Sequence, residues 1–347
     1  MACQPLISGI MLSLGPNSFA DSSYLYRMGA GEWRAELDAM QRFGIDWLGC
    51  WSGLETCVER RAAVPGGDLI GFLLREAEER NMRLSLSCGF CPGWWEEWNL
   101  PKALAFTGRS IERLRRRYGA FRSFDSWYLD YEIYLRWGEE AEQMAELYRG
   151  VTAYCHEADR RPVMVSPFFQ PDTSGRCGVF RYGEPAEYYP FWRDLLAGSG
   201  IDILALQDNG GQHLGCFGDG ERLPFIREVT RACRDAGVRY WGNVESGELP
   251  VASVDAFAER YGAGGDVNDR RIRPDWRAVP LPKLERKLEL AARDAEKIMS
   301  WGYMEFFRPG GGAENRRNYQ AYCSYRDSVR GIEVESASSE LLAAGSV

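Results

Sequence analysis

The hydrophobic pattern alternates between two kinds of segment along the chain. Short apolar runs of strand length are each followed by a stretch in which apolar residues recur every three or four positions, as in an amphipathic helix. The pattern predicts strands at 7–14, 47–53, 83–90, 126–134, 163–169, 201–209, 239–245 and 302–308. It predicts the following helices at 31–43, 68–81, 102–118, 139–157, 187–197, 224–236, 283–299 and 315–330. Eight such units indicate a single-domain (β/α)8 barrel, a TIM barrel.

The connecting segments differ at the two ends of the predicted barrel. Glycine stands at helix ends just before the next strand, as at Gly44, Gly200 and Gly237, whereas the strand-to-helix loops are longer. We expect residues 1–332 to form the barrel, with 249–282 inserted between the seventh strand and the seventh helix, and 333–347 to form a flexible tail. The insertion is either a lid over the barrel mouth or a solvated surface excursion.

The fourth strand carries acidic side chains on its inward face. Successive side chains of a strand point to opposite sides. The apolar set, suited to the helix layer, is Trp127, Leu129, Tyr131 and Ile133. The inward set is therefore Tyr128, Asp130, Glu132 and Tyr134. Because burying a carboxylate costs several kcal/mol unless it is paired or wet, we interpret Glu132 as a functional residue.

The seventh strand supplies a second glutamate. Trp241, Asn243 and Glu245 share its inward parity, and strands four and seven lie across the barrel mouth from each other. Glu132 and Glu245 are therefore candidate catalytic residues that flank a substrate. A carboxyl separation of about 5–5.5 Å would favour a retaining glycosidase mechanism. The alternative for Glu245 is a structural ion pair with Arg308.

A group of aromatic and polar residues at predicted strand ends suits carbohydrate, which stacks on rings and accepts bidentate hydrogen bonds. The candidate substrate-binding residues are Asp130, Tyr134, Trp51, Trp94, Trp95, Gln207, Asn209, Trp241, Asn243 and Glu305. Some of these tryptophans must be ordinary packing. Glu305 has two possible roles, to hold one of the other glutamates or to neutralise Arg308.

The charge and composition of the chain argue against some classes of binding partner. The 347 residues carry a net charge of −8 with acidic and basic residues mixed throughout, which argues against nucleic acid as a partner. No apolar stretch approaches the roughly 18 residues of a membrane span, and the first residues lack a basic leader region, so we expect a cytoplasmic location and no membrane association. The oligomeric state is left open.

The cysteines and histidines give little support for redox or zinc chemistry. Cys88 and Cys91 have the spacing of a dithiol motif, but the Pro92–Gly93 that follows leads into a loop rather than a helix. Only His156 and His213 are present among 347 residues, which argues against a structural zinc site. We expect reduced cysteines and neither metal nor cofactor.

Three segments carry a family resemblance. Residues 128–133 (YLDYEI), 165–169 (VSPFF) and 202–208 (DILALQD) resemble a glycosidase-like TIM-barrel family catalogued as domain of unknown function 4434. The chain is also similar to the large retaining-glycosidase clan, in which the acid/base glutamate ends strand four and the nucleophile ends strand seven. The resemblance implies these roles for Glu132 and Glu245. The clan usually has Asn before the first glutamate, where this chain has Tyr131, so Asn243 or Asn209 would have to replace it.

Two other functional classes fit the same residues. A divalent-metal-dependent sugar isomerase or lyase would use Asp130, Glu132, Glu245 and Glu305 as oxygen ligands. A non-catalytic carbohydrate-binding barrel would keep the aromatic platforms without a defined carboxylate geometry. A phosphate-bearing ligand is a variant, because residues 308–312 form an Arg-Pro-Gly-Gly-Gly loop before the last helix.

Overall fold

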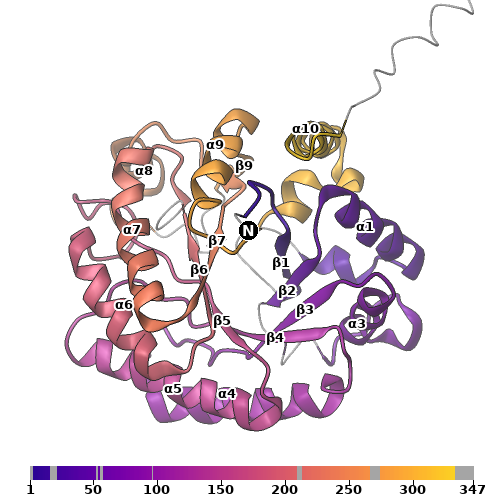
Figure 1. The fold of residues 1–347 in the computed structure, drawn as a ribbon, viewed down its shortest axis with the longest axis horizontal. Helices are drawn as coiled ribbons and strands as arrows, with labels where there is room; N and C mark the ends of the chain where they lie inside the picture. The colour runs from indigo at the N-terminus through magenta and orange to yellow at the C-terminus, as the bar shows by residue number, and fades with distance from the viewer. Residues whose placement is uncertain are drawn as a thin grey trace, which may run out of the picture.

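The fold is a closed barrel of parallel strands. The computed structural model describes residues 3–15, 22–51, 54, 58–95, 97–208, 213–265 and 274–332. Within these residues eight parallel strands close in the order β1-β10-β7-β6-β5-β4-β3-β2, surrounded by helices (Figure 1). The strands are β1 (Gly9–Ser13), β2 (Trp47–Trp51), β3 (Arg83–Ser87), β4 (Phe124–Leu129), β5 (Val163–Val165), β6 (Ile203–Gln207), β7 (Arg239–Asn243) and β10 (Lys297–Ser300). The predicted (β/α)8 TIM barrel is confirmed.

Some of the outer helices begin or end at capping residues. They are α1 (Ala30–Phe43), α3 (Leu69–Glu79), α4 (Leu100–Tyr118), α5 (Glu139–Asp159), α6 (Pro185–Ser199), α7 (Asp219–Ala236), α9 (Leu281–Ala291) and α10 (Ala313–Val329). Asp68 caps α3 by accepting from the Gly71 N–H, and Asn99 caps α4 in the same way. Gly44 and Gly237 end α1 and α7 in the left-handed conformation that glycine adopts readily.

The eighth strand was predicted in the wrong place. It is β10, whereas the predicted segment 302–308 holds a π-helical turn over Tyr303–Phe307. The helix predicted to run to residue 299 ends at Ala291. The prediction was too long because the apolar side chains of β10 continue the helical spacing and hide the boundary. Gly302, with φ +88°, turns the chain out of the sheet. Glu305 therefore lies beyond the strand, on a π-helical turn, a feature often found at functional sites.

The barrel has two apolar layers. A small interior cluster fills its centre: Met11, Trp47, Tyr128, Met164, Ile203, Ala205, Trp241 and Met299. Trp47 and Trp241 pack edge to face there, with ring centroids 5.5 Å apart. A much larger core lies between strands and helices and includes the outward set of β4 and the residues that follow it. The inside-outside alternation is therefore observed within β4 itself, with Tyr128 inside, but Tyr134, which was predicted to face inward, belongs to the outer core.

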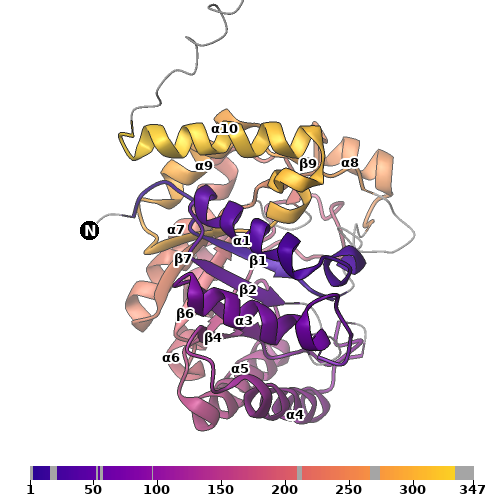
Figure 2. The ribbon, with the colours of Figure 1, turned by 90° about the vertical axis from the view of Figure 1, so that its right-hand side faces the viewer.

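The segment after β7 packs onto the barrel. It contains α8 (Val254–Tyr261) and a two-stranded antiparallel sheet, β8 (Gly247–Glu248) with β9 (Arg277–Ala278). Its described part shares a small core with the loops after β5 and β6: Cys177, Leu214, Phe217, Leu249, Val251 and Phe257. Figure 2 shows α8 at the end of the barrel opposite the N-terminus. The described part of the insertion is thus a packed element of the mouth rather than a solvated excursion.

The buried Glu248 fastens this insertion. Its carboxylate accepts from Arg277 at 2.8 Å and from Lys283 at 2.6 Å, and Lys283 also donates to the Gly215 carbonyl at 2.8 Å. Residues 266–273 of the insertion and the predicted tail 333–347 lie outside the described residues. In the part of the chain that the structure describes, no helix is both long and apolar enough to cross a membrane.

Candidate active site

Glu132 lies at the barrel mouth just past the end of β4. The chain turns sharply there, with the Glu132 N–H donating to the Asp130 carbonyl at 2.8 Å. One carboxylate oxygen accepts from the Tyr128 hydroxyl, and the other accepts from Nε2 of Gln207 at 2.8 Å. The same Gln207 nitrogen also donates to the Ser166 carbonyl at 2.8 Å. The ends of β4, β5 and β6 therefore hold this partly exposed carboxyl group in one position.

The environment of Glu132 favours its protonated form. Burial raises the pKa of Glu132 to about 7, although the hydrogen bonds from Tyr128 and Gln207 lower it. The imidazole of His213 lowers this pKa further and the carboxylate of Glu245 raises it. His213 and Glu245 are therefore close enough for their charges to affect the pKa of Glu132. A carboxyl group with a pKa near neutrality is suited to general acid-base work.

Glu245 follows β7 and is fully buried. Its Oε2 is hydrogen-bonded to Nδ1 of His213, while its Oε1 has no hydrogen-bond partner among the described residues. Its backbone is held on both sides, because its N–H donates to Asp208 Oδ1 at 3.0 Å and its carbonyl accepts from Lys287 Nζ at 2.5 Å. A buried oxygen without a partner is costly, and such atoms are often found where a ligand completes the site.

A buried ionic network lies behind Glu245, on the helix side of β6 and β7. Asp208 faces the helix layer and contacts Lys287 Nζ at 3.0 Å and Arg222 Nη1 at 3.4 Å. Arg222 also pairs with Asp219 at 2.7 Å, and burial lowers the pKa of Lys287. The network fixes the backbone of Glu245 from outside the barrel.

His213 is a site residue that sequence reasoning missed. It precedes α7 on the loop after β6, where strand parity predicts nothing, and it has φ +52°. Its ring lies 5.4 Å from the Trp276 ring and 5.1 Å from the Trp301 ring, which pack edge to face on each other. Trp276 comes from the insertion. The sequence gives one signal for a role of His213 in the site, which is its position shortly after the predicted strand 201–209.

Several predicted binding residues do lie near the mouth. Asn243 donates to Ser166 Oγ at 3.0 Å, and its buried Oδ1 has no hydrogen-bond partner among the described residues. Trp51 is partly exposed against the barrel-interior cluster. Asp130 instead binds the start of the β3–α4 loop, accepting from Ser87 Oγ at 2.6 Å and the Gly89 N–H at 3.0 Å. Asn209 lies outside the described residues.

The remaining aromatic candidates divide into packing and rim positions. Trp241 is 4% exposed inside the barrel, below the carboxylates. Trp94 is 8% exposed and packs on Tyr131, with ring centroids 5.0 Å apart. Trp95, in contrast, is 45% exposed, whereas Tyr134 is 3% exposed and packs on Phe168 and Phe180; the guanidinium of Arg136 lies against both rings. Trp241 and Trp94 thus occupy packing positions in this structure.

Glu305 and Arg308 are not partners. Arg308 pairs with Glu36 at 3.2 Å and lies over the Tyr24 ring, so the suggested ion pairs of Arg308 with Glu245 and with Glu305 are wrong. Burial raises the pKa of Glu305, whose charge in turn raises the pKa of Tyr24. The charge of Glu305 therefore acts on Tyr24, which lies on the 3-10 helix that follows β1. The guanidinium of Arg308 is paired with Glu36, so it does not offer a free positive charge to a phosphate at the Arg-Pro-Gly-Gly-Gly loop.

The acidic residues proposed for a metal site have separate surroundings. Asp130 is hydrogen-bonded to Ser87 at the end of β3, Glu245 is hydrogen-bonded to His213, and Glu305 lies on the π-helical turn after β10. Across the described ranges no group of three or more His, Cys, Asp or Glu side chains is placed to hold a metal ion.

The two cysteines with the spacing of a dithiol motif are not paired with each other. The sulfur of Cys88 lies 3.6 Å from that of Cys155 on α5 rather than beside Cys91.

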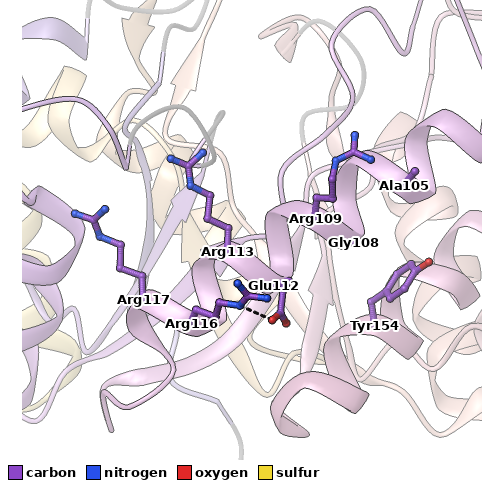
Figure 3. Close-up of a pocket in the computed structure, with 8 residues that line it drawn as sticks. All are labelled: Ala105, Gly108, Arg109, Glu112, Arg113, Arg116, Arg117 and Tyr154. Carbon is purple, nitrogen blue, oxygen red and sulfur yellow. Dashed lines mark hydrogen bonds and ion pairs between the residues drawn. The ribbon is translucent and has the colours of Figure 1, made fainter.

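A groove on the outer face of α4 and α5 lies away from the mouth (Figure 3). It is lined by Ala105, Gly108, Arg109, Glu112, Arg113, Arg116, Arg117 and Tyr154. Its arginines are largely neutralised, since Arg116 pairs with Glu112 at 2.6 Å and Arg117 with Asp68 at 3.1 Å. We assign no role in the chemistry to this groove.

The fold places the chain in the class of (β/α)8 TIM barrels. The chain belongs to the family described as Domain of unknown function (DUF4434), whose model matches residues 7–311. None of the curated proteins matches the chain.

Solved structures share the fold at low sequence identity. A "putative alpha-L-fucosidase" from Bacteroides thetaiotaomicron VPI-5482 is 20% identical with a TM-score of 0.70, over 96% of this chain and 94% of that one. The endo-beta-1,4-mannanase from Thermotoga petrophila is 12% identical with a TM-score of 0.50, over 96% and 78%. The beta-galactosidase from Marinomonas ef1 is 11% identical with a TM-score of 0.53, over 94% and 61%. At these identities the likeness is one of fold.

Proposed function

We propose that this protein is a retaining glycoside hydrolase in which Glu132 is the acid/base and Glu245 the nucleophile. The observation that supports this most strongly is the contrast between the two carboxyl groups. Glu132 has its pKa raised to about 7, whereas Glu245 is held by His213 and keeps one oxygen without a partner. Two carboxyl groups in different environments are what the double-displacement mechanism requires.

The first chemical step follows from these environments. The protonated Glu132 donates its proton to the glycosidic oxygen as the leaving group departs, while Oε1 of Glu245 attacks the anomeric carbon. The products are the released alcohol and a glycosyl ester on Glu245. Gln207 and Tyr128 then stabilise the Glu132 carboxylate that has formed, because both already donate to its oxygens.

The second step restores the enzyme. The Glu132 carboxylate removes a proton from water, the water oxygen attacks the anomeric carbon, and the ester bond to Glu245 breaks. Glu132 ends protonated and Glu245 ionised, as at the start. Two inversions at one carbon give a product of retained configuration. The fold likeness to the named mannanase and beta-galactosidase supports a carbohydrate substrate.

The proposal is tested with a panel of aryl glycosides and natural oligosaccharides. Wild type is compared with Glu245→Gln and Glu132→Gln, and with Glu296→Gln as a control, an exposed acid paired with Arg239. We expect the first two variants to lose about 10³-fold or more in kcat and the control to keep the wild-type rate. Equal hydrolysis by wild type and Glu245→Gln would refute the assignment.

A further inference from the structure

An arginine-aromatic rim lies just beyond Glu132, on the loops after β3, β4 and β5. Its described members are Trp95, Tyr134, Arg136, Trp137, Phe180 and Arg181. The rings form a continuous row, since Phe180 lies 5.4 Å from Tyr134 and 6.4 Å from Trp95. The rim contrasts in charge with the carboxylates of Glu132 and Glu245 at the centre of the mouth.

Arg136 is held in this rim by rings rather than by an acid. Its guanidinium lies 4.3 Å from the Tyr134 ring centroid and 5.0 Å from that of Trp95. Its side chain forms no hydrogen bond or ion pair with any other residue that the structure describes, although Glu97 belongs to the same loop as Trp95. Two rings fix the plane of the guanidinium, and no described residue engages its N–H donors.

Arginines elsewhere in the chain commonly have carboxylate partners. Arg80 pairs with Asp38 at 2.9 Å, Arg34 pairs with Glu76 at 2.8 Å, and Arg239 pairs with Glu296 at 2.7 Å. In the rim the arrangement of Arg136 is repeated by Arg181, which lies 4.1 Å from the Trp137 ring and has no ion pair within the described ranges. Two such arginines on one edge of the mouth indicate an anionic ligand.

Trp95 supplies a platform beside this cation. It is 45% exposed, and its ring packs against that of Trp94 in a tilted arrangement, with centroids 4.3 Å apart. An indole held by Trp94 and Arg136 offers its exposed apolar surface at little cost in side-chain entropy. Such a face suits the apolar C–H surface of a sugar.

The rim lies on the leaving-group side of the site. Glu132 and Arg136 belong to the same irregular segment, which runs from the end of β4 to the start of α5. If Glu132 protonates the leaving oxygen, the departing part of the substrate lies toward this segment and away from Glu245. This step rests on the function proposed above.

We propose that the arginine-aromatic rim is a subsite for an acidic sugar in the leaving-group part of the substrate. The pyranose stacks on Trp95, and its carboxylate or sulfate accepts hydrogen bonds from the guanidinium of Arg136. The substrate class is therefore an oligosaccharide that carries uronate or sulfated residues, rather than a neutral glucan or mannan.

The test measures binding by calorimetry to Glu245→Gln, so that no turnover is needed. The probes are tetrasaccharides of galacturonate, of alginate and of chondroitin sulfate, each compared with its carboxyl-reduced or desulfated form. Carboxyl reduction and desulfation then distinguish the two sources of negative charge. Each probe is measured with Arg136→Gln, with Trp95→Ala, and with Arg231→Gln as a control, whose guanidinium lies 3.6 Å from the Tyr189 ring on the outer helices.

We expect at least one acidic probe to bind ten-fold or more tightly than its neutral form. Arg136→Gln should abolish this preference, Trp95→Ala should weaken both forms, and Arg231→Gln should change neither. No preference for any acidic form, or a preference that survives Arg136→Gln, overturns the subsite. Selective binding by a wild-type protein that hydrolyses none of the probes or aryl glycosides would refute the proposed hydrolase while leaving the subsite intact.

Discussion

The imidazole of His213 is hydrogen-bonded through Nδ1 to the buried carboxylate of Glu245. The bond leaves Oε1 as the carboxylate oxygen without a partner among the described residues, so the histidine determines which oxygen is available for attack. Because Trp276 and Trp301 pack on the ring of His213, the insertion after β7 is linked to the same carboxylate.

His213→Ala is therefore expected to lower kcat by about 10- to 100-fold with a smaller effect on KM, since removing a residue that orients a reacting group typically costs that much. The matched control is His156→Ala, because His156 is bonded to Asp202 at 3.0 Å on the outer side of the barrel. Steady-state kinetics of both variants provide the measurement. Similar losses in the two variants would show that the effect is structural.

The raised pKa of Glu132 predicts the pH dependence of the reaction. A general acid must be protonated, so kcat/KM should fall as the pH rises through about 7. The Tyr128 hydrogen bond lowers the pKa of Glu132, so Tyr128→Phe should shift the alkaline limb of the pH profile, where kcat/KM falls, to higher pH. Tyr131→Phe should leave it in place, because that hydroxyl bonds Thr107 and the Cys91 N–H on the helix side. A limb that moves equally in both variants would contradict the assignment of the acid.

The same pKa predicts a cost in stability. A carboxyl group with a pKa of about 7 in the folded protein and about 4.3 when unfolded binds more protons in the folded state between these values. The penalty of the charged form is absent below pH 4, develops as the pH rises from 4.5 to 7, and is complete above 7. Glu132→Gln should thus be more stable than wild type at pH 8 by on the order of 1–3 kcal/mol, and no more stable at pH 4. Urea denaturation at the two pH values measures this, and a difference independent of pH would refute it.

The buried network behind Glu245 should be expensive to break. Lys287→Met leaves Asp208 without one of its cations and the Glu245 carbonyl without its donor, so we expect a loss of about 3–5 kcal/mol in the free energy of unfolding. The matched control is Arg239→Met, which removes an exposed pair with Glu296 and should cost about 1 kcal/mol or less. Urea titrations of the two variants should differ clearly. Equal losses would mean that the Lys287 network adds nothing beyond an ordinary surface pair.

Periodicity predicted the barrel because each strand and helix carries its own pattern of buried positions. It failed at β10, where the segment Lys297–Ser300 is short and its apolar residues continue the spacing of α9. Strand parity placed Tyr128 correctly and led to Glu132, although β4 itself ends at Leu129.

Periodicity and strand parity did not predict the contacts that loop residues make. His213 approaches Glu245 from a loop residue with positive φ, and Trp276 contacts His213 because the insertion packs on the loops after β5 and β6. Strand parity also does not show how deep along the barrel axis a side chain lies. Trp241 faces inward but lies in the barrel interior, and for this reason it was wrongly predicted at the mouth.

The most direct test of the central claim is the configuration of the glycosyl azide formed when an activated aryl glycoside and azide are given to Glu132→Ala and to Glu245→Ala. In Glu132→Ala, azide should attack the glycosyl ester on Glu245 and give a product of retained configuration. In Glu245→Ala, azide should take the place of the missing carboxylate and give the inverted product. Nuclear magnetic resonance of the two products identifies each anomer. The same anomer from both variants, or wild-type hydrolysis by either one, would contradict the account.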